Sequence, residues 1–382
     1  MADFIFRISP NVVLGSYVVT RVPQYVKEYG SRFMVVMDPV LKDVGLADKI
    51  LQPLNERNVD YFIFDELNDG ANSKQIQQAL ELAKQGYVQG IIAVGGTKAL
   101  NIASAVAALF NESFGIYDCL DGTVPTKEAL PLICVPTTIR IPFLFNPVIP
   151  LIDARCNQIK LMKVQKEICK LAVMDSTLIA SLTENQKSSI SLETLCIAVE
   201  AYLSQKASFF SDMFCEKSAE LFGYALDGSK SLEIATPEEV LLEQAGCMAS
   251  LAASTSSVGV ASLISLAMNA RFRLSRSLVS AILFPYIIED ASKFKTEKLE
   301  KFAKMMNIVP SDATREDAVQ AFADNIRQRL VQANLPVRLK DLSLSVEQLA
   351  LIAEDASSLD IMNQLPRSMT ADDLFDLLKL AY

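Results

Sequence analysis

The chain has 382 residues, none of which is histidine, and only 14 of which are glycine. Without imidazole there is no Ser-His or Cys-His nucleophile pair and no histidine general base, and the commonest ligand of catalytic zinc and non-haem iron is missing. Any metal would need carboxylate, thiolate or carbonyl ligands. Glycine usage lies well below the average of about 7%. Phosphate-cradling loops, which are built from glycine, are therefore expected to be few.

Charge and cysteine usage narrow the class of protein further. The formal net charge of −9 argues against nonspecific binding to nucleic acid or to an anionic membrane, so we expect neither partner. The seven cysteines are odd in number and scattered without a CxxC pair, which is typical of reduced, mostly buried thiols. With no readable secretory signal, these features predict a cytoplasmic globular protein.

Strand-like and helix-like patterns alternate in the first half of the chain. The apolar runs are Phe33–Met37, Tyr61–Phe64, Gly90–Val94 and Leu132–Val135, and the helical patterns are Val19–Tyr29, Ser73–Gln85 and Lys98–Phe110. Short connections between them predict a Rossmann-like parallel sheet covered by helices. The carboxyl edge of such a sheet is where α/β folds bind ligands.

The pattern changes in the second half. Val148–Asp153 and Cys169–Asp175 are predicted to form an antiparallel pair across a polar turn. From about Thr183 onward the strong signals are helical, and Ser345 is predicted to be an N-cap. The predicted helices are Ser191–Leu203, Pro237–Ala253, Arg273–Ile288, Arg315–Val331 and Ala371–Ala381. We therefore predict an α/β domain over residues 1–180 and an all-helical domain over residues 181–382.

One turn carries a phosphate-binding signal. Gly95, Gly96, Thr97 and Lys98 follow the Gly90–Val94 run and open a helix. A glycine pair at this point lets backbone amides approach a phosphate at the positive end of the helix dipole. The alternative is a tight connection with no ligand.

With this turn, four further stretches resemble the iron-containing alcohol dehydrogenases, a branch of the superfamily that includes glycerol dehydrogenase and dehydroquinate synthase. They are Val35–Asp38, Cys134–Thr138, Ala198–Tyr202, and the C-terminal Asn363, Pro366, Arg367 and Thr370. The resemblance implies a dehydroquinate synthase-like fold and a homodimer. It also implies a dinucleotide site at Asp38, Gly95, Gly96, Thr97, Lys98, Thr137 and Thr138, where Asp38 would disfavour the 2′-phosphate of NADP.

The chain departs from this family at the metal. The resemblance places the four family ligands on Glu193, Ile197, Ser262 and Arg276, and a further active-site histidine on Leu266. Isoleucine has no lone pair and a guanidinium brings a permanent positive charge, so neither iron nor zinc is expected there. We predict that Glu193 and Arg276 form an ion pair in place of the metal. The alternative is that each side chain reaches solvent.

The nucleotide positions are altered too. The third glycine of the family turn is lost, Asn101 and Ser104 stand at later motif positions, and Ile139–Phe145 replaces a glycine-rich stretch. Whether NAD(P) still binds is therefore left open, and Lys98 and Arg140 favour an anionic ligand.

Two functions fit these observations. The first is a divergent, metal-free pseudoenzyme that binds an anionic small molecule or acts as an interaction subunit. The alternative is an NAD(P)-dependent alcohol or aldehyde oxidoreductase with a metal-independent site. No residue is assigned a catalytic role, and the candidate residues of the cleft are Glu193, Ser262, Leu266 and Arg276.

Overall fold

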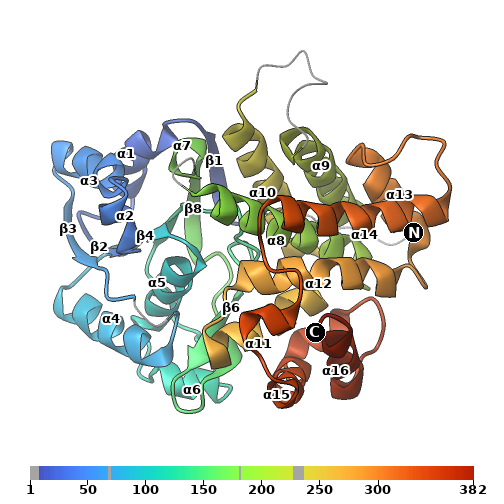
Figure 1. Cartoon of the computed structure of the whole chain (residues 1–382). Coiled ribbons are helices and arrows are strands. Elements are labelled where there is room, and N and C mark those ends of the chain that lie inside the picture. Colours follow the sequence, from blue (N-terminus) through green and yellow to red (C-terminus); the bar gives the residue numbers. More distant parts are fainter. Residues whose placement is uncertain (1–7, 68–69, 180–181, 227–235) are drawn as a thin grey trace, which may run out of the picture. The chain divides into compact units, whose positions relative to one another are not determined.

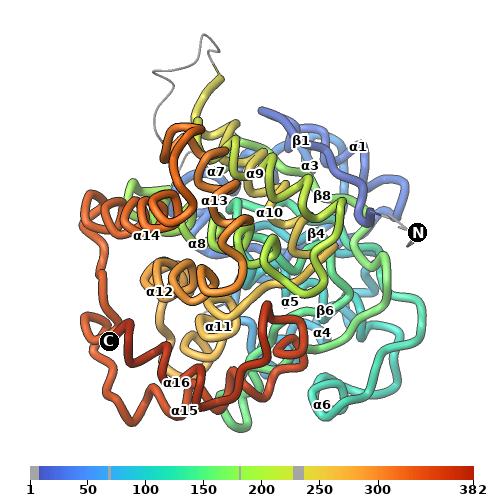
Figure 2. Tube along the Cα trace, turned by 90° about the vertical axis from the view of Figure 1, so that its right-hand side faces the viewer, coloured from blue at the N-terminus to red at the C-terminus, as the bar shows by residue number. Residues whose placement is uncertain are grey.

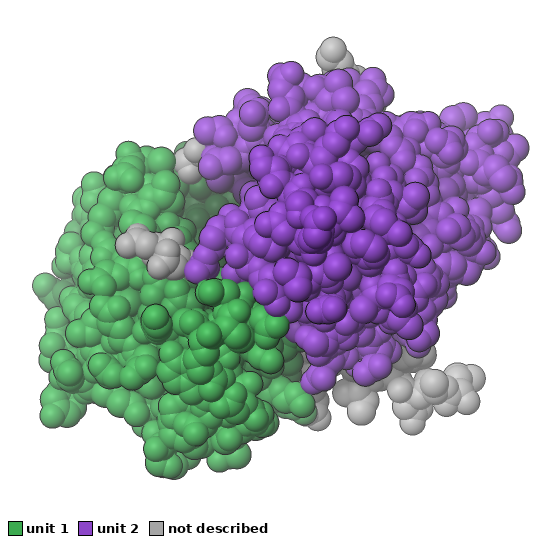
Figure 3. Space-filling view, turned by 60° about the horizontal axis from the view of Figure 1, so that its bottom comes forward, with its two compact units in different colours: residues 1–181 green, residues 182–382 purple. Residues whose placement is uncertain are grey.

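The computed structural model describes residues 8–67, 70–179, 182–226 and 236–382. The chain divides into two compact units, residues 1–181 and residues 182–382, which Figure 3 colours separately. Each unit has its own core. We describe them in turn.

The first unit is built on a six-stranded parallel sheet with the order β1-β8-β5-β4-β2-β3 (Figure 1). The strands are β1 Asn11–Gly15, β2 Arg32–Met37, β3 Asp60–Phe64, β4 Gly90–Gly95, β5 Leu132–Pro136 and β8 Cys169–Asp175. Every residue of β4 and β5 is buried. Such continuous apolar strands are expected in a sheet that helices cover on both faces.

Alternate side chains of the sheet enter separate cores. Ile92 and Val94 of β4 pack with α1 Val22–Val26, α2 Val40–Asp43 and α3 Ala47–Glu56 on one face. The other face is covered by α5 Thr97–Leu109, which packs in turn on α4 Ser73–Gln85. Ala99–Leu109 of α5 are all buried, because this helix lies between the sheet and α4. The short helices α6 Ile116–Leu120 and α7 Ser176–Ile179 complete the unit.

The predicted pairing of Val148–Asp153 with Cys169–Asp175 is wrong. Cys169–Asp175 is β8, a strand of the main sheet that is parallel to both β1 and β5. The first segment, β6 Val148–Asp153, instead pairs in antiparallel fashion with β7 Gln158–Lys163. β7 was not predicted as a strand because its lysines interrupt the apolar pattern, and the strand is only partly buried. The apolar run of β8 is instead typical of a parallel strand that is buried on both faces.

The second unit is helical, as predicted. Its helices are α8 Glu184–Leu203, α9 Phe209–Leu226, α10 Glu238–Thr255, α11 Val260–Phe272, α12 Arg276–Ala291, α13 Thr296–Met305, α14 Arg315–Gln332, α15 Val346–Ser357 and α16 Ala371–Leu380, with 3₁₀ turns at Leu339–Leu342 and Asp360–Gln364. Residues 191–203 of α8 are all buried, because α9, α10 and α12 pack around this helix (Figure 2). This stretch is mostly apolar, as expected for a helix at such a central position, and its buried Glu193 and Glu200 are the exceptions.

Three helices of this unit begin with a side-chain cap, one of which was predicted. Ser345 caps α15, where its Oγ accepts a hydrogen bond from the N–H of Gln348, as predicted. Thr183 and Thr370 form the same reciprocal arrangement at the starts of α8 and α16. Among the described residues, no single helix is long and apolar enough to cross a bilayer.

Candidate functional site

The turn after β4 has the geometry of a phosphate-binding turn. Gly95 has φ +141°, and a Cβ there would lie 2.9 Å from the Cβ of Asp38, so only glycine fits without strain. Gly96 is the N-cap of α5, and a Cβ on Gly96 would meet no atom within 4 Å. There is therefore space beside the N-cap of this 13-residue helix, at the end where the helix dipole is positive.

The sheet brings the other predicted cofactor residues to this turn. Asp38 follows β2, and its N–H donates to the Val94 carbonyl at 3.0 Å. Thr137 follows β5, and its N–H donates to the Gly95 carbonyl at 3.0 Å. Lys98, on the first turn of α5, places its Nζ 4.0 Å from Oδ2 of Asp38. The convergence follows from the topology, because β2, β4 and β5 are parallel neighbours whose carboxyl ends share one edge.

Arg140 adds a second cation to the turn. Its backbone N–H donates to Oγ1 of Thr138 at 3.3 Å, and its Nη2 donates to Oγ1 of Thr97 at 3.4 Å. The guanidinium therefore lies beside the first residue of α5. Together, Lys98, Arg140 and the helix N-terminus concentrate positive charge where the turn is open, which suits a phosphate group.

The two altered motif positions on α5 have structural roles. Asn101 donates from its side chain to the Pro150 carbonyl at 3.0 Å, and so ties α5 to β6. Ser104 donates to the Leu100 carbonyl one turn earlier at 2.8 Å. Both side chains are buried, so neither is presented at the open end of the turn.

In the helical unit, the predicted ion pair between Glu193 and Arg276 is present. Nη2 of Arg276 lies 3.7 Å from Oε1 of Glu193, and the side chains are 8% and 1% exposed. The pair joins the middle of α8 to the first residue of α12. Removing two charges from water is costly, and their mutual attraction offsets part of that cost.

Two further positions of the predicted site carry apolar side chains. Ile197 and Leu266 are buried members of the core of the helical unit. Ile197 lies one turn after Glu193 on α8, so the same helical face that carries the carboxylate continues as apolar surface. Neither residue can ligate a metal or take part in proton transfer.

The hydroxyl of Ser262 is directed to a different carboxylate. Its Oγ donates to Oε2 of Glu200 at 2.5 Å, and the N–H groups of Gly259, Ala261 and Ser262 donate to the same carboxylate at 2.9, 2.6 and 3.3 Å. Glu200 thus caps α11, where a negative charge complements the helix dipole. Burial nevertheless outweighs these donors and raises the pKa of Glu200 above its ordinary value.

Gly259 is required by this cap. A Cβ at Gly259 would lie 2.8 to 2.9 Å from three carbons of the Glu200 side chain. The glycine at the N-cap of α11 and the glutamate on α8 therefore form one packed unit. Ser262, the third predicted ligand position, belongs to this unit and not to the Glu193–Arg276 pair.

The donor set does not fit iron or zinc. The four predicted positions supply one carboxylate, one hydrocarbon, one hydroxyl that is bonded to Glu200, and one cation. Zinc and non-haem iron are held by three or four imidazole, thiolate or carboxylate groups. No cluster of three such side chains that could hold a metal occurs in the described part of the chain.

Two further reactive or charged side chains on these helices, Cys196 and Arg271, have environments that suit structural roles. Burial raises the pKa of the Cys196 thiol well above its ordinary value, and the nearby Glu200 and Glu193 carboxylates add to this effect. The thiol therefore stays protonated and is a poor nucleophile. Arg271 forms an ion pair with Asp355 on α15, so its charge serves to hold α11 against α15.

A parallel sheet with a glycine turn at its carboxyl edge, followed by an all-helical unit, defines a two-domain protein with a Rossmann-like first unit. Residues 9–176 match the family "Iron-containing alcohol dehydrogenase", and residues 189–382 match "Fe-containing alcohol dehydrogenase family, C-terminal". The chain belongs to the iron-containing alcohol dehydrogenase family. The family predicted from the sequence is confirmed.

Several proteins of known name and several solved structures are similar to this chain over nearly their full length. The chain is 21% identical to lactaldehyde reductase of Escherichia coli strain K12 over 91% of both chains, and 22% identical to NADPH-dependent butanol dehydrogenase of Clostridium saccharobutylicum over 92% of both. A crystal structure of 1,3-propanediol oxidoreductase covers 100% of both chains with a TM-score of 0.91 at 17% identity. An iron-containing alcohol dehydrogenase from Thermotoga maritima gives 0.82 at 19% identity, with 99% of both chains covered. These structures establish the shared fold.

Sequence reasoning missed two features of the site. It treated Glu200 only as part of a motif, although its carboxylate organises the start of α11. It also gave Arg140 no defined partner, because the hydrogen bond from Arg140 to Thr97 spans 43 positions in the sequence. Arginine in place of a glycine-rich stretch was the signal that pointed to this cation.

Proposed function

We propose that this protein binds a nucleotide through its phosphates at the turn after β4 and uses no divalent metal at its family's iron position. The observation that carries the proposal is the contrast between the two units. At the sheet edge, Asp38, Gly96, Lys98, Thr137 and Arg140 keep an open, positively charged turn. In the helical unit, an ion pair and apolar side chains replace the ligands.

The residues present fit a dinucleotide at its phosphate and ribose end. The amides at the start of α5, with Lys98 and Arg140, would hold the phosphates, and Asp38 would accept hydrogen bonds from ribose hydroxyls. A bound nicotinamide dinucleotide supplies a hydride donor or acceptor. The bulky Ile139–Phe145 stretch replaces glycines beside this turn, so the fit is better supported for the adenosine half than for the nicotinamide half.

The metal in such an enzyme acts as a Lewis acid, which polarises the carbonyl and lowers the pKa of the alcohol. With no ligand set for it, this chain would lose the metal-dependent alcohol dehydrogenase reaction. The proposal is therefore a nucleotide-binding pseudoenzyme of the family. Such a pseudoenzyme would bind an anionic small molecule or a protein partner.

One observation favours a second function. Arg276 places a permanent cation at a former ligand position, and a buried guanidinium stabilises a developing oxyanion electrostatically. A metal-independent oxidoreductase that reduces small aldehydes would use Arg276 in this way. Its pairing with Glu193 reduces the charge available for that role.

A paired binding and turnover experiment tests both functions. The chelator-treated protein is titrated with NADH and with ADP-ribose by calorimetry, and NADH oxidation is then followed with a panel of short aldehydes. Saturable binding of both nucleotides without turnover is the result that we expect. Turnover that disappears in Arg276→Met supports the metal-independent enzyme. Absence of binding at about millimolar ligand removes both functions.

A further inference from the structure

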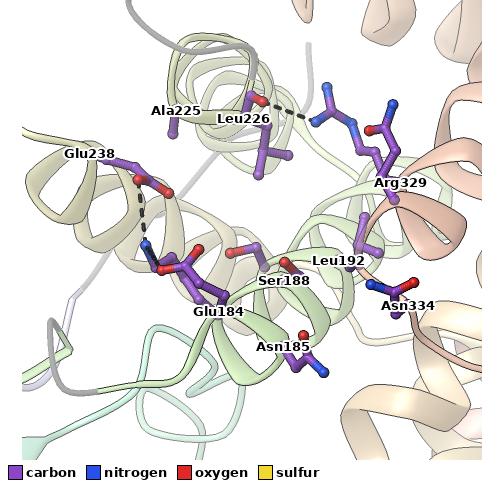
Figure 4. A pocket seen from close by; sticks show the side chains of 13 residues that line it. Glu184, Asn185, Ser188, Leu192, Ala225, Leu226, Glu238, Arg329 and Asn334 are labelled. Atoms are coloured by element: carbon purple, nitrogen blue, oxygen red, sulfur yellow. Dashed lines mark hydrogen bonds and ion pairs between the residues drawn. The ribbon is translucent and has the colours of Figure 1, made fainter.

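A separate pocket of about 420 Å³ lies in the helical unit, where four helices begin or end. The first turns of α8 and the start of α10 form one side, and the ends of α9 and α14 form the other (Figure 4). Its volume lies within the range of about 300–1,000 Å³ that is typical of small-molecule sites. None of its lining residues belongs to the turn after β4 or to the four former ligand positions.

The charged side chains of this pocket have protein partners. Nζ of Lys187 lies 3.0 Å from a Glu184 carboxylate oxygen and 3.5 Å from Glu238. Arg329 donates from Nη1 to the Leu226 carbonyl at 3.0 Å, as Figure 4 shows, and from Nε to Asn325 at 2.8 Å. Two cations and two anions also give the wall no net formal charge. An ionic ligand would have to compete with these contacts, so a neutral ligand suits the pocket better.

The other polar groups of the wall are amides and hydroxyls. They belong to Asn185, Gln332 and Asn334, which are exposed, to the half-buried Ser188, and to Ser191, which is buried on α8. Ser191 is 1% exposed, and its hydroxyl has no hydrogen-bond partner within the described ranges. A buried hydroxyl without a partner costs free energy, so this group is suited to a hydrogen bond with a bound molecule.

We propose that this pocket binds a neutral polyhydroxylated molecule of about the size of a hexitol, with the Ser191 hydroxyl bonded to one of its hydroxyl groups. Amides and serines both donate and accept, which matches a ligand whose hydroxyls do the same. Leu192 and Leu226 supply apolar wall for its C–H groups. This site does not depend on nucleotide binding.

The test uses sorbitol as the probe, with the full chain, in saturation-transfer NMR and calorimetry. Gluconate and glucosamine serve as probes of similar size with negative and positive charge. Ser191→Ala removes the unpaired hydroxyl, and Ser188→Trp fills the mouth of the pocket. Ser189→Ala is the matched control, because Ser189 lies on the same helix, donates to the Gln186 carbonyl at 3.1 Å and does not line the pocket.

The expected result is saturable sorbitol binding that weakens at least about tenfold in Ser191→Ala, is lost in Ser188→Trp and is unchanged in Ser189→Ala. Ser191→Ala should unfold at the same temperature as the wild type or higher, because it removes an unpaired buried group. Lack of saturation by sorbitol at about 50 mM would overturn the proposal. Preferential binding of gluconate or glucosamine, or equal weakening by Ser189→Ala, would overturn it as well.

Discussion

The guanidinium of Arg276 lies 3.7 Å from the carboxylate of Glu193, across the interface between α12 and α8. Both residues stand where the family resemblance places metal ligands. The pair therefore links two of the three helices that carry the former ligand positions, by a contact that needs no cofactor. Its consequences for stability, metal binding and ligand choice are open to direct measurement.

Breaking this pair from one side should destabilise the protein. Arg276→Met removes this cation from a buried carboxylate and Glu193→Leu removes this anion from a buried guanidinium, and each loss is expected to lower the free energy of unfolding by about 3–5 kcal/mol. The double variant should recover most of that loss, because no uncompensated charge remains. Urea denaturation of the four proteins measures the coupling. Additive losses would show that the two side chains do not stabilise each other.

Rebuilding the ligand set should restore metal binding. The variant Glu193→Asp, Ile197→His, Ser262→His and Arg276→His carries three imidazoles and a carboxylate, which suit a divalent transition metal. It should bind one equivalent of Co²⁺ with an absorbance spectrum of nitrogen and oxygen coordination, whereas the wild type should show no such spectrum. Ile197→His alone is the control. A wild-type protein that binds cobalt with the same spectrum would contradict the assignment of these positions.

The two cations at the turn should govern nucleotide affinity. Lys98→Ala and Arg140→Ala are each expected to weaken NADH binding about tenfold, because a charge-assisted contact to phosphate is lost. Lys74→Ala, an exposed lysine on α4 of the same unit, should leave the affinity unchanged. Calorimetry at two salt concentrations measures all four proteins. If Lys74→Ala weakens binding as much as Lys98→Ala does, the loss of affinity is caused by the change in net charge and not by the loss of a phosphate contact at the turn.

Asp38 should select NADH over NADPH. Its carboxylate lies at the carboxyl end of β2, beside Gly95, and would repel a 2′-phosphate. Asp38→Ser should therefore raise the affinity for NADPH relative to NADH, and Asp43→Ser on α2 should not change the ratio. Competition between the two cofactors, followed by fluorescence, gives the ratio directly. An unchanged ratio in Asp38→Ser would place the ribose elsewhere.

Glu200 should make stability depend on pH. Because the pKa of Glu200 is raised in the folded protein, the folded state binds the proton more tightly than the unfolded state does. The stability of the wild type relative to Glu200→Gln should then be greatest below the ordinary value of 4.5 and should fall as the pH rises through the folded pKa. Denaturant titrations of both proteins from about pH 4 to pH 8 show whether the relative stability of the wild type falls or rises with pH. A relative stability that rises with pH would mean that the donors on α11 outweigh burial.

Much of the sheet edge could be predicted from local pattern. The β-branched run of β4, the glycine pair and the long apolar helix α5 are all encoded within about twenty residues, so their order and bounds were predicted within one residue. The meeting of Asp38 with Gly95 and Thr137 followed from the rule that parallel strands share their carboxyl edge. The strands that pair with β8 could not be predicted in this way, because the local sequence of a strand does not determine which strands lie beside it.

The helical unit shows where sequence reasoning ends. The pairing of Glu193 with Arg276 could be inferred, because two opposite charges fell on positions that the family brings together. The bond between Ser262 and Glu200 could not, since it joins residues 62 positions apart through the start of α11. The pocket beside Ser191 also depends on where four helices end, which local patterns do not fix. The homodimer, the cytoplasmic location and the anionic ligand stay predictions.

Metal-independent nucleotide binding is tested most directly by one NADH titration performed twice on the wild-type protein, first in chelator and then with saturating Fe²⁺ under anaerobic conditions. We expect saturable binding with the same affinity and the same heat in both titrations, because the phosphates are held at the turn after β4 and no metal enters the helical unit. Binding that requires iron, or that tightens markedly with it, would contradict this mode of binding. So would the absence of binding in both titrations.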